Sequence, residues 1–398
     1  MPQDRKPGLL VLASTYPRWS GDPEPGFVHE LARRMTGRFR VTVLCPHAPG
    51  VPVEETMDGV DVVRYRYAPE AWETLVNDGG VVANLRRAKW KCALVPGFVL
   101  AQAWCAWRLV RRRRINVVHA HWLVPQGLVA VLLSKLGRRG LPFLVTSHGA
   151  DLFALRAWPF PAIKRLVIRE AADVTVVSEG MLAEIAQLGG DRDRVGVEPM
   201  GVDLKGRFRP DPSVSRSRSE ILFVGRLVEK KGLQHLLNAM PLIRSKRPDV
   251  RLTIAGFGPD MEARREQVAR LGMEDSVEFL GPIAQIDLPG LYRRAALFVA
   301  PFVEARSGDQ DGLGLVLIEA LGCGCPVVAS NLPATRALLV SCAAAYEAVP
   351  GDPTSISQAV LKALDAGGSP LGEDIAGFDW EVRAAAYGAR LDYIAADS

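Results

Sequence analysis

The feature that most constrains the fold of this chain is a regular alternation of short β-branched runs with longer helical patterns. Such alternation is typical of βαβ units arranged around a parallel sheet. The runs expected to form strands in the first half are 9–13, 41–45, 60–65, 117–120, 143–146 and 174–177. The pattern restarts at 221–224, 251–255, 277–280, 297–300 and 326–329. We therefore predict an α/β chain with two doubly wound, Rossmann-like domains.

A polar break separates the two series of strands. Residues 205–219 are rich in Pro and Ser and keep no hydrophobic periodicity, which is typical of a linker. We predict an N-terminal domain over 1–204, a linker over 205–219, a C-terminal domain over 220–378, and a C-terminal helix over 379–398 that packs on the first domain. Ligands of doubly wound sheets bind beyond the carboxyl ends of the strands, so we expect the two domains to face each other across a ligand-binding cleft.

The charged residues are unevenly distributed. The 398 residues are 48% hydrophobic and 23% charged, which excludes a disordered or fibrous chain, and the formal net charge is only +5. No acidic residue lies between Gly79 and Ala150, although this window is rich in Lys and Arg. A window of this kind indicates a surface that meets phosphate, on nucleic acid or on anionic lipid, or simply a solvated basic face. No nucleic-acid recognition motif accompanies it.

Neither an export signal nor a membrane span is expected from the apolar segments. The run 9–13 is too brief for the core of a signal peptide, and 92–107 is interrupted by Pro96, Gly97 and Gln102 and falls short of the length needed to span a bilayer. The six cysteines form no C-x-x-C pair, which favours buried thiols in a reducing compartment. We predict a cytoplasmic protein.

The second domain opens with a strand that leads directly into Gly225-Arg226-Leu227-Val228-Glu229-Lys230-Lys231-Gly232 and a helix. Arg226 and Lys231 therefore stand at the carboxyl end of a strand and just before a helix N-terminus, where an anion is favoured. The turn can bind a diphosphate. The alternative is that both side chains are solvated loop charges.

A glycine-rich turn follows the strand 297–300 and leads into another helix, with Asp311 at its mouth and Glu319 two helical turns later. Gly312 and Gly314 let the backbone approach a ligand closely, and N–H groups of the first helical turn can bind phosphate or sugar oxygens. The two carboxylates could contact the sugar and ribose ends of a nucleotide sugar. The alternative is that they are surface acids of an amphipathic helix.

The two blocks VGRLVEKKG and DGLGLVLIEALGCGCPVVA, in this order and spacing, resemble the signature of the retaining glycosyltransferases of family 4, and the resemblance spans almost the whole chain. It implies the two-domain GT-B fold and transfer of a sugar from a UDP- or GDP-sugar to a glycan or polyprenyl-linked acceptor in cell-surface polysaccharide biosynthesis. The alternative function is a non-catalytic nucleotide-sugar or membrane-binding module on the same scaffold.

The resemblance assigns the donor site residue by residue. It implies that Arg226 and Lys231 bind the donor diphosphate, that Asp311 meets the donor sugar and that Glu319 meets the ribose hydroxyls. Asp311 stands where the family has Glu, so its reach is shorter by one methylene, and either the backbone lies closer or the sugar specificity differs. The remaining residues implied in donor binding are Gly312, Leu313, Gly314 and Leu315.

In the first domain, the strand 143–146 ends in Ser147-His148-Gly149-Ala150-Asp151, which matches the H-G-x-D turn of the family. The resemblance places His148 against the donor sugar and phosphate, where it could donate a hydrogen bond to the leaving group. Gly149 and Asp151 belong to the same turn. Asp151 could orient His148 or cap the following helix, and we favour the cap. His119 and His121 are expected to pack in the core.

Near the start of the chain, Gly26 precedes a helix and matches the family loop that approaches the donor phosphate and the acceptor, although the doubled glycine of relatives is absent. The D-x-D patterns at 191–193 and 309–311 are not taken as metal sites, because Arg226 and Lys231 supply the positive charge. We therefore expect no metal and no other cofactor. The basic and aromatic segment Arg86–Arg114 is predicted to contact an anionic membrane, or else to be a buried helix with a solvated basic tail.

Overall fold

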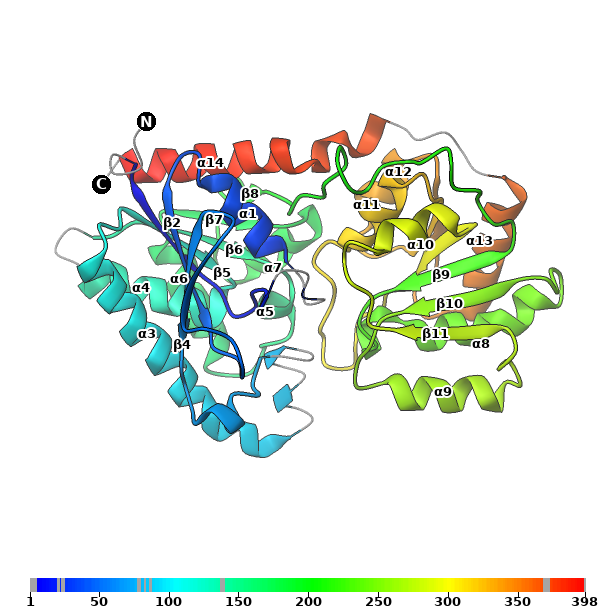
Figure 1. Ribbon diagram of the computed structural model, residues 1–398, viewed down its shortest axis with the longest axis horizontal. Helices are drawn as coiled ribbons and strands as arrows, with labels where there is room; N and C mark the ends of the chain where they lie inside the picture. The colour runs from blue at the N-terminus through cyan, green and yellow to red at the C-terminus, as the bar shows by residue number, and fades with distance from the viewer. Residues whose placement is uncertain are drawn as a thin grey trace. The chain divides into compact units, whose positions relative to one another are not determined.

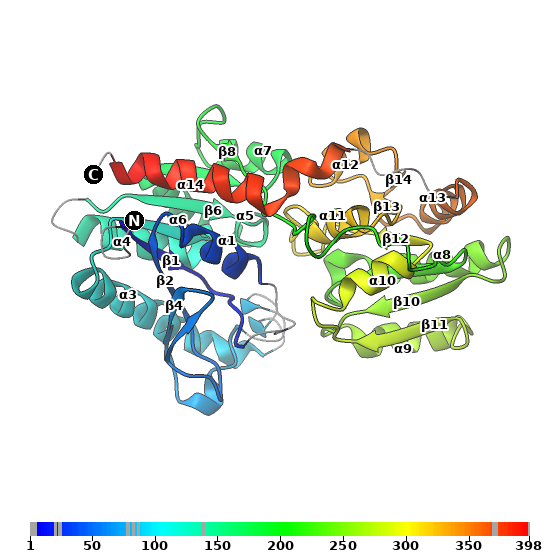
Figure 2. The same cartoon turned by 45° about the horizontal axis from the view of Figure 1, so that its top comes forward.

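The computed structural model describes residues 6–19, 22, 26–76, 80–81, 84–85, 88–136, 140–367 and 373–396, and it divides into two compact units. Unit 1 comprises residues 1–200 and 381–398, and unit 2 comprises residues 201–380. Figures 1 and 2 show that each unit is a sheet with helices on both faces.

Unit 1 contains an eight-stranded sheet in the order β3-β4-β2-β1-β5-β6-β7-β8, in which only β3 runs antiparallel to its neighbour. Helices α1 and α14 cover one face, and α3, α4 and α6 cover the other (Figures 1 and 2). The strands are β1 (Gly8–Leu12), β2 (Arg40–Pro46), β3 (Glu54–Met57), β4 (Val60–Tyr65), β5 (Val117–His121), β6 (Phe143–Ser147), β7 (Asp173–Val176) and β8 (Gly196–Val197). The helices are α1 (Phe27–Met35), η2 (Glu70–Trp72), η3 (Lys89–Ala93), α3 (Leu94–Arg112), η4 (Leu123–Gly127), α4 (Leu128–Leu136), α5 (Ala150–Phe153), α6 (Phe160–Glu170), η5 (Glu179–Met181), α7 (Leu182–Gln187) and α14 (Trp380–Ala396).

Unit 2 contains a six-stranded parallel sheet in the order β11-β10-β9-β12-β13-β14. Helices α8 and α13 pack together on one face, and α10 and α11 pack on the other (Figure 2). The strands are β9 (Glu220–Val224), β10 (Arg251–Ala255), β11 (Val277–Gly281), β12 (Leu297–Ala300), β13 (Val327–Ser330) and β14 (Ala345–Ala348). The helices are η6 (Glu229–Lys231), α8 (Leu233–Arg244), α9 (Met261–Arg270), α10 (Leu288–Arg294), α11 (Leu315–Gly322), α12 (Arg336–Ser341), α13 (Pro353–Asp365) and η7 (Glu373–Phe378).

The central strands are almost continuously apolar because both faces of each sheet are covered by helices. All five residues of β1, β5 and β6 are buried, and so are the last four residues of β9. In unit 2, the core between the sheet and the α8–α13 face is filled by side chains such as Phe223, Leu236 and Ile254. The expected parallel α/β architecture is therefore confirmed in both units.

The stretch 205–219, which we predicted to be a linker, belongs to unit 2. The Arg216 guanidinium donates hydrogen bonds to the carbonyl oxygens of Ala295 at 2.7 Å and Cys323 at 3.2 Å, and the Phe208 side chain is buried. The polar composition predicted an exposed segment. Instead, Arg216 donates hydrogen bonds to carbonyl oxygens just after α10 and α11, where helix ends leave such oxygens without a partner in the helix. The segment 381–398 lies in unit 1, where the Tyr387 hydroxyl donates to the Glu198 carbonyl oxygen at 2.6 Å.

The apolar helix of unit 1 is longer than the sequence indicated. Among the described residues, one helical segment, Lys89–Arg112, is long and apolar enough to cross a membrane by length and composition. We expected Pro96 to interrupt it, but Pro96 lies in the first turn of α3, where a missing N–H costs nothing. One face of α3 packs inside unit 1 through Leu94, Phe98 and Leu109.

Candidate active site

The two topological switch points of the chain are where its functional side chains gather. In unit 2 the chain moves outward from β9 to β11 and then returns to place β12 beside β9, so the loops after β9 and β12 emerge next to each other. Such a crevice, at the carboxyl ends of adjacent strands, is the common ligand site of doubly wound sheets. The backbone N–H of Val303 donates to the Lys230 carbonyl oxygen at 2.9 Å and holds the two loops together.

Gly232 makes this close approach possible. It adopts a left-handed conformation (φ +70°) between η6 and α8, and a Cβ atom at this position would lie 1.6 Å from the Pro301 carbonyl oxygen. A side chain is excluded on both grounds. The glycine of the predicted diphosphate turn is therefore required by the fold, and it fixes Lys231 immediately before the start of α8.

The predicted Lys231 and Asp311 lie in one cluster with Lys230 and Asp309. The Lys231 ammonium forms an ion pair with Asp311 and lies 4.4 Å from the centre of the Phe302 ring. Lys230 pairs with Asp309 at 3.1 Å and lies 3.6 Å from Asp311. Burial alone would raise the pKa of Asp311, but Lys231, Lys230 and Arg226 outweigh it and hold that pKa below its usual value. Asp311 is therefore ionised, and the cations around it can also hold an anionic ligand.

The predicted glycine-rich turn is present before α11. Gly314 has φ +74° and occupies the N-cap position of α11, and a Cβ atom there would lie 2.9 Å from the Phe302 ring. Gly312 and Leu313 form the turn before it, and Leu315 is the first helical residue. The Leu317 N–H donates to the Gly314 carbonyl oxygen at 2.9 Å, and the first N–H groups of a helix, here those of Leu315 and Val316, have no carbonyl partner earlier in the helix. Binding of a donor by these residues remains a prediction.

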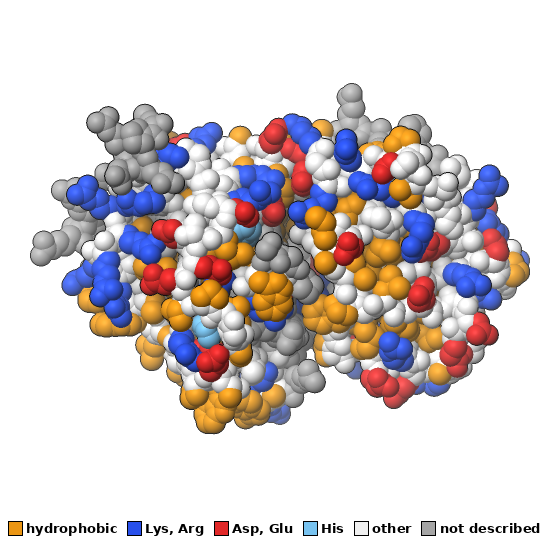
Figure 3. Space-filling model, in the orientation of Figure 1, with side chains coloured by type: hydrophobic (Ala, Val, Ile, Leu, Met, Phe, Trp, Pro, Cys, Tyr) orange, Lys and Arg blue, Asp and Glu red, His pale blue; other side chains and the backbone are white. Residues whose placement is uncertain are grey.

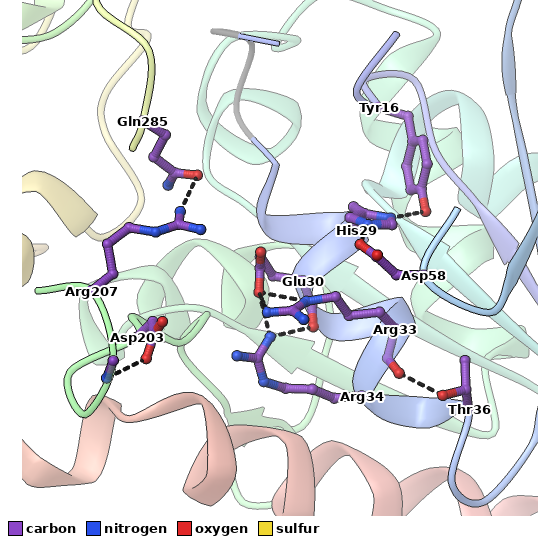
Figure 4. Close-up of polar contacts among 11 residues, drawn as sticks. Tyr16, His29, Glu30, Arg33, Arg34, Thr36, Asp58, Asp203, Arg207 and Gln285 are labelled. Carbon is purple, nitrogen blue, oxygen red and sulfur yellow. Dashed lines mark hydrogen bonds and ion pairs between the residues drawn. The ribbon is translucent and has the colours of Figure 1, made fainter. Parts of the chain in front are cut away.

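Glu319 is buried inside unit 2, which excludes the surface-acid alternative for this residue. The Tyr292 hydroxyl donates a hydrogen bond to it at 3.1 Å, and Gln285 also bonds to it. Burial raises the pKa of Glu319 to about 7. Gln285 in turn accepts a hydrogen bond from Arg207 at 3.1 Å (Figure 4). Sequence reasoning did not identify Tyr292, Gln285 or Arg207, because none of them lies in either signature block.

The raised pKa of Glu319 predicts a pH-dependent loss of stability. In the unfolded chain this carboxyl ionises near 4.5, whereas in the folded chain it keeps its proton until about pH 7. The folded state therefore loses stability relative to the unfolded state as the pH rises from about 5 to 8, by up to about 3 kcal/mol. Glu319→Gln keeps the shape and does not titrate. Chemical denaturation at pH 5 and pH 8 should show a gap between wild type and variant that depends on pH, whereas parallel curves would contradict the assignment.

In unit 1, His148 lies in the turn after β6, and the left-handed Gly149 (φ +103°) starts α5. The His148 ring packs against Phe27, with ring centres 4.9 Å apart, and against Trp122 at 5.0 Å. Burial lowers the pKa of His148 to about 3, so the ring is neutral at physiological pH. A neutral imidazole can donate one hydrogen bond and accept another.

Asp151 does not cap α5 as predicted. Gly149 occupies the N-cap position, and Asp151 lies in the first turn, where its buried carboxylate accepts hydrogen bonds from the Leu123 N–H at 2.7 Å, the His148 N–H at 3.1 Å and the Ser147 hydroxyl at 3.0 Å. Asp151 thus joins the loop after β5 to the turn after β6. The Lys164 ammonium is also buried, donates to the Leu152 carbonyl oxygen at 2.7 Å and interacts electrostatically with Asp151.

His119 and His121 are buried, as expected, but His121 also touches the predicted site. Its Nδ1 lies 2.9 Å from Nε2 of His148. The two residues are 27 positions apart, and the parallel pairing of β5 with β6, in which His121 faces Thr146, brings them together. Only the strand register, which the sequence pattern does not specify, could have revealed this contact.

Gly26 starts α1, but the structure does not require glycine there. Its φ is −88°, and a Cβ atom would meet only the Pro17 side chain, at 3.7 Å. The helix itself is rich in polar contacts: the His29 ring bonds to the Tyr16 hydroxyl at 2.6 Å and to Asp58 at 2.8 Å (Figure 4). The role of Gly26 in acceptor binding stays a prediction.

No cluster of three or more His, Cys, Asp and Glu side chains suited to a metal ion occurs in the part of the chain that the structure describes. The D-x-D pattern at 309–311 is tied to lysines: Asp309 bonds to Lys230, and Asp311 bonds to Lys231. Asp191 accepts a hydrogen bond from the backbone N–H of Asp193 at 3.1 Å, which is an ordinary turn contact.

Two family models match this chain, one in each unit. Residues 27–205 match the family model described as Glycosyltransferase Family 4, and residues 218–366 match the model described as Glycosyl transferases group 1. The chain is 31% identical over 240 residues to the GDP-mannose-dependent alpha-(1-6)-phosphatidylinositol monomannoside mannosyltransferase of Mycobacterium tuberculosis, covering 56% of this chain and 61% of the relative. It is 32% identical over 248 residues to the D-inositol 3-phosphate glycosyltransferase of Pseudarthrobacter chlorophenolicus, covering 56% and 57%.

Solved structures show the same fold. Sucrose-phosphate synthase from Thermosynechococcus elongatus matches with a TM-score of 0.79 and 21% identity, covering 99% of this chain and 100% of that chain. Anabaena HepE in complex with UDP and glucose matches with a TM-score of 0.70 and 18% identity, covering 96% and 99%. At this identity the likeness shows the fold alone, which is GT-B. The alignments with the curated relatives span about three fifths of their length (61% and 57%).

Proposed function

Because the chain belongs to glycosyltransferase family 4, we propose that it transfers a sugar from a UDP- or GDP-sugar to a glycan or lipid-linked acceptor with retention of the anomeric configuration. The observation that carries this proposal is the cluster of Lys231, Lys230 and Asp311 at the switch point of unit 2, with Glu319 buried in the helix that follows. Relatives named for GDP-mannose and a fold neighbour solved with UDP support a nucleotide-sugar donor.

The proposed chemistry depends on charge exchange at Lys231. When a donor binds, its diphosphate takes up the Lys231 and Arg226 cations, which stabilise the negative charge that develops as the nucleoside diphosphate leaves. Asp311 then turns from Lys231 to the hydroxyls of the donor sugar, and Glu319 accepts hydrogen bonds from the ribose. The acceptor hydroxyl attacks from the side on which the diphosphate leaves, which retains the configuration. With two cations in place we propose that no metal ion is needed.

The test is incubation of the purified protein with a panel of radiolabelled UDP- and GDP-sugars and a crude lipid-linked glycan extract, in the presence of EDTA. The proposal predicts sugar incorporation or slow donor hydrolysis with at least one donor, and no loss of rate with EDTA. Donor binding without incorporation or hydrolysis would favour a non-catalytic nucleotide-sugar module instead. Activity abolished by EDTA and restored by a divalent cation would refute metal independence.

We also propose that unit 1 contacts an anionic membrane through η3 and α3. Large apolar side chains are exposed there: Trp90 is 55% exposed, Trp104 57% and Leu100 69%. Figure 3 shows hydrophobic side chains gathered along the lower edge of unit 1, where Figure 1 places this segment, with Lys and Arg side chains to their left. Arg111 lies over the Trp107 ring at 4.1 Å. An exposed aromatic face flanked by cations is suited to a headgroup layer.

Two details sharpen the membrane proposal. Arg113 forms an ion pair with Asp61 at 2.8 Å, so it belongs to the unit 1 surface and is not a free lipid contact. Arg86 and Arg87, which we assigned to the same patch, lie outside the described residues, as do Arg138 and Arg139. Cys45, Cys323 and Cys325 are buried free thiols, as expected, whereas Cys92 is exposed. Free thiols are consistent with the cytoplasmic location that we propose, at the inner face of the membrane.

Replacing Trp90, Leu100 and Trp104 together by serine is expected to reduce binding to phosphatidylglycerol vesicles at least about tenfold, because the apolar area that enters the interface is lost. Cosedimentation measures the effect. The matched control is Ile286→Ser with Val340→Ser, which removes two apolar side chains from unit 2 that are more exposed (70% and 84%) than the three replaced in unit 1, and it should leave binding unchanged. Equal vesicle binding by the wild type, the triple variant and the control would contradict membrane contact and show that the exposed face of α3 is an ordinary solvated surface.

A further inference from the structure

Three histidines lie together at the ends of β5 and β6 in unit 1. His119 and His121 point to the same face of the sheet, because they are two residues apart on β5, and their ring centres are 4.2 Å apart. Both are buried, with 1% of their surface exposed. His148 follows β6 and is the partly exposed member of the group. A role in packing alone would not require three imidazoles at one place.

The contact between His121 and His148 is directional. Nδ1 of His121 lies 2.9 Å from Nε2 of His148, and the two ring planes differ by only 16°. Phe27 and Trp122 pack against the His148 ring. One nitrogen of His148 is therefore committed to His121, and Nδ1 is the nitrogen with which this residue can bind a ligand.

The direction of the proton follows from what surrounds His121. Both rings are neutral, because burial lowers their pKa values, so one nitrogen of the pair must donate and the other must accept. Within the described residues, Nε2 of His121 has no hydrogen-bond acceptor. A proton there would leave a buried N–H unpaired, which is costlier than an unpaired acceptor. The proton therefore sits on Nδ1 of His121, which donates to His148.

We propose that His121 is a positioning residue that fixes His148 in the tautomer protonated on Nδ1, so that His148 presents an N–H to the donor sugar or its phosphate. The consequence for transfer rests on the proposed function, but the tautomer itself does not. Without the His121 donor, the His148 proton can move to Nε2, and Nδ1 then becomes an acceptor that repels a phosphate oxygen.

The backbone around the pair holds this arrangement in place. The Asp151 carboxylate accepts hydrogen bonds from the His148 N–H at 3.1 Å and from the Leu123 N–H at 2.7 Å. It therefore links the backbone of His148 to the loop that follows His121. Trp122, directly after His121, has φ +80°, an uncommon conformation for a residue with a side chain. Residues held in such conformations concentrate at functional sites. The pair is thus positioned from both strands.

His119 provides a matched control within the same strand. It is as buried as His121, but its Nε2 bonds to the Thr146 hydroxyl at 2.8 Å and its ring faces Tyr387. Replacing it removes a buried imidazole from the same core without touching His148. A structural role for the histidines predicts similar effects of His119→Phe and His121→Phe, whereas the positioning role predicts effects on His148 from His121→Phe alone.

The test is the tautomeric state of His148 in the full chain, read from two-bond ¹H–¹⁵N correlation spectra assigned with His148→Gln. The wild type and His119→Phe are expected to show His148 protonated on Nδ1. His121→Phe should shift His148 toward the Nε2–H form, and His121→Asn, whose amide can replace the lost donor, should restore the wild-type state. His148 protonated on Nε2 in the wild type, or unchanged in His121→Phe, would overturn the proposal.

Steady-state kinetics of the His121 variants show whether the tautomer of His148 affects the rate of sugar transfer. His121→Phe is expected to lower kcat roughly 10- to 100-fold, as loss of the group that orients a working histidine commonly does, with little change in donor KM. His121→Asn should recover most of the rate. If the spectra show the predicted tautomer shifts but the wild type transfers no sugar, the role of His121 in fixing the His148 tautomer is supported and the proposed function is refuted. A normal kcat in a folded His121→Phe variant with a shifted tautomer would refute the consequence for catalysis.

Discussion

Replacing Lys231 by methionine is expected to lower kcat/KM for sugar transfer by roughly 100- to 1,000-fold, the range typical for loss of one group that stabilises developing charge. Lys231 lies directly before the start of α8, and its ammonium pairs with Asp311. Without it, the donor diphosphate loses a cation at the point where its negative charge increases during departure of the sugar. Steady-state kinetics with the donor identified by the labelled-sugar panel measure the effect.

Stability must be separated from catalysis in this experiment. Lys231→Met leaves the Asp311 carboxylate with a weaker partner, Lys230 at 3.6 Å, and an unpaired buried carboxylate is destabilising. The double variant Lys231→Met/Asp311→Asn removes both charges, so it should fold as well as the wild type and still be inactive. Lys230→Met is the matched control, because Lys230 carries the same charge one residue earlier and bonds to Asp309. An equal loss of activity in Lys230→Met would show that Lys231 has no special role.

Replacing Asp151 by alanine is expected to lower the free energy of unfolding of unit 1 by about 3 kcal/mol or more. The buried carboxylate accepts three hydrogen bonds, two of them from backbone N–H groups, and their donors would be left without a partner. The buried Lys164 would lose a neighbouring negative charge as well. The His148 turn would be released, so activity should fall together with stability.

The control for this effect is Asp191→Ala, which removes an exposed carboxylate from unit 1 and should change stability by less than about 0.5 kcal/mol. A double-mutant cycle with Lys164→Met measures the coupling. If Asp151 and Lys164 stabilise each other, the double variant should lose less than the sum of the two single losses. Additive losses, or an Asp151→Ala variant as stable as Asp191→Ala, would show that the carboxylate does not hold the turn.

Much of the fold could be predicted from the alternation of apolar runs. The strands at 60–65, 251–255 and 297–300 match β4, β10 and β12 to the residue. Strand β12 (LFVA) is a continuous buried apolar run, as expected of a parallel strand covered on both faces, and β4 and β10 are marked by their β-branched residues. The edge strands β3, β8 and β14 were missed. Their residues are partly exposed and follow no apolar run, so composition alone could not distinguish them from loops.

The candidate site was predictable where local sequence determines it. Gly232 and Gly314 occupy left-handed positions, as glycine-rich turns before helices require, and Lys231 and Asp311 meet because their loops follow adjacent strands. The contacts that could not be predicted join residues far apart in the chain. Tyr292 reaches Glu319 from another helix, and His121 reaches His148 across the pairing of two strands.

The misjudged segments share a physical cause. Residues 205–219 look like a linker because they are polar, but Arg216 uses its charge to satisfy carbonyl oxygens of unit 2. Asp151 looks like a helix cap because it is an acid near a helix start, but Gly149 takes the cap position and Asp151 bonds to the preceding loop instead. Buried polar side chains form hydrogen bonds, but the sequence does not show which groups are their partners, because the tertiary structure brings those groups together.

The most direct test of the proposed function is the identity of the products formed from the preferred nucleotide sugar. Nuclear magnetic resonance of the reaction should show release of the intact nucleoside diphosphate and a new glycosidic bond with the anomeric configuration of the donor, and both should be lost in Lys231→Met/Asp311→Asn. Release of a nucleoside monophosphate, an inverted product, or unchanged turnover in that variant would contradict the assignment of unit 2 as the donor site of a retaining glycosyltransferase.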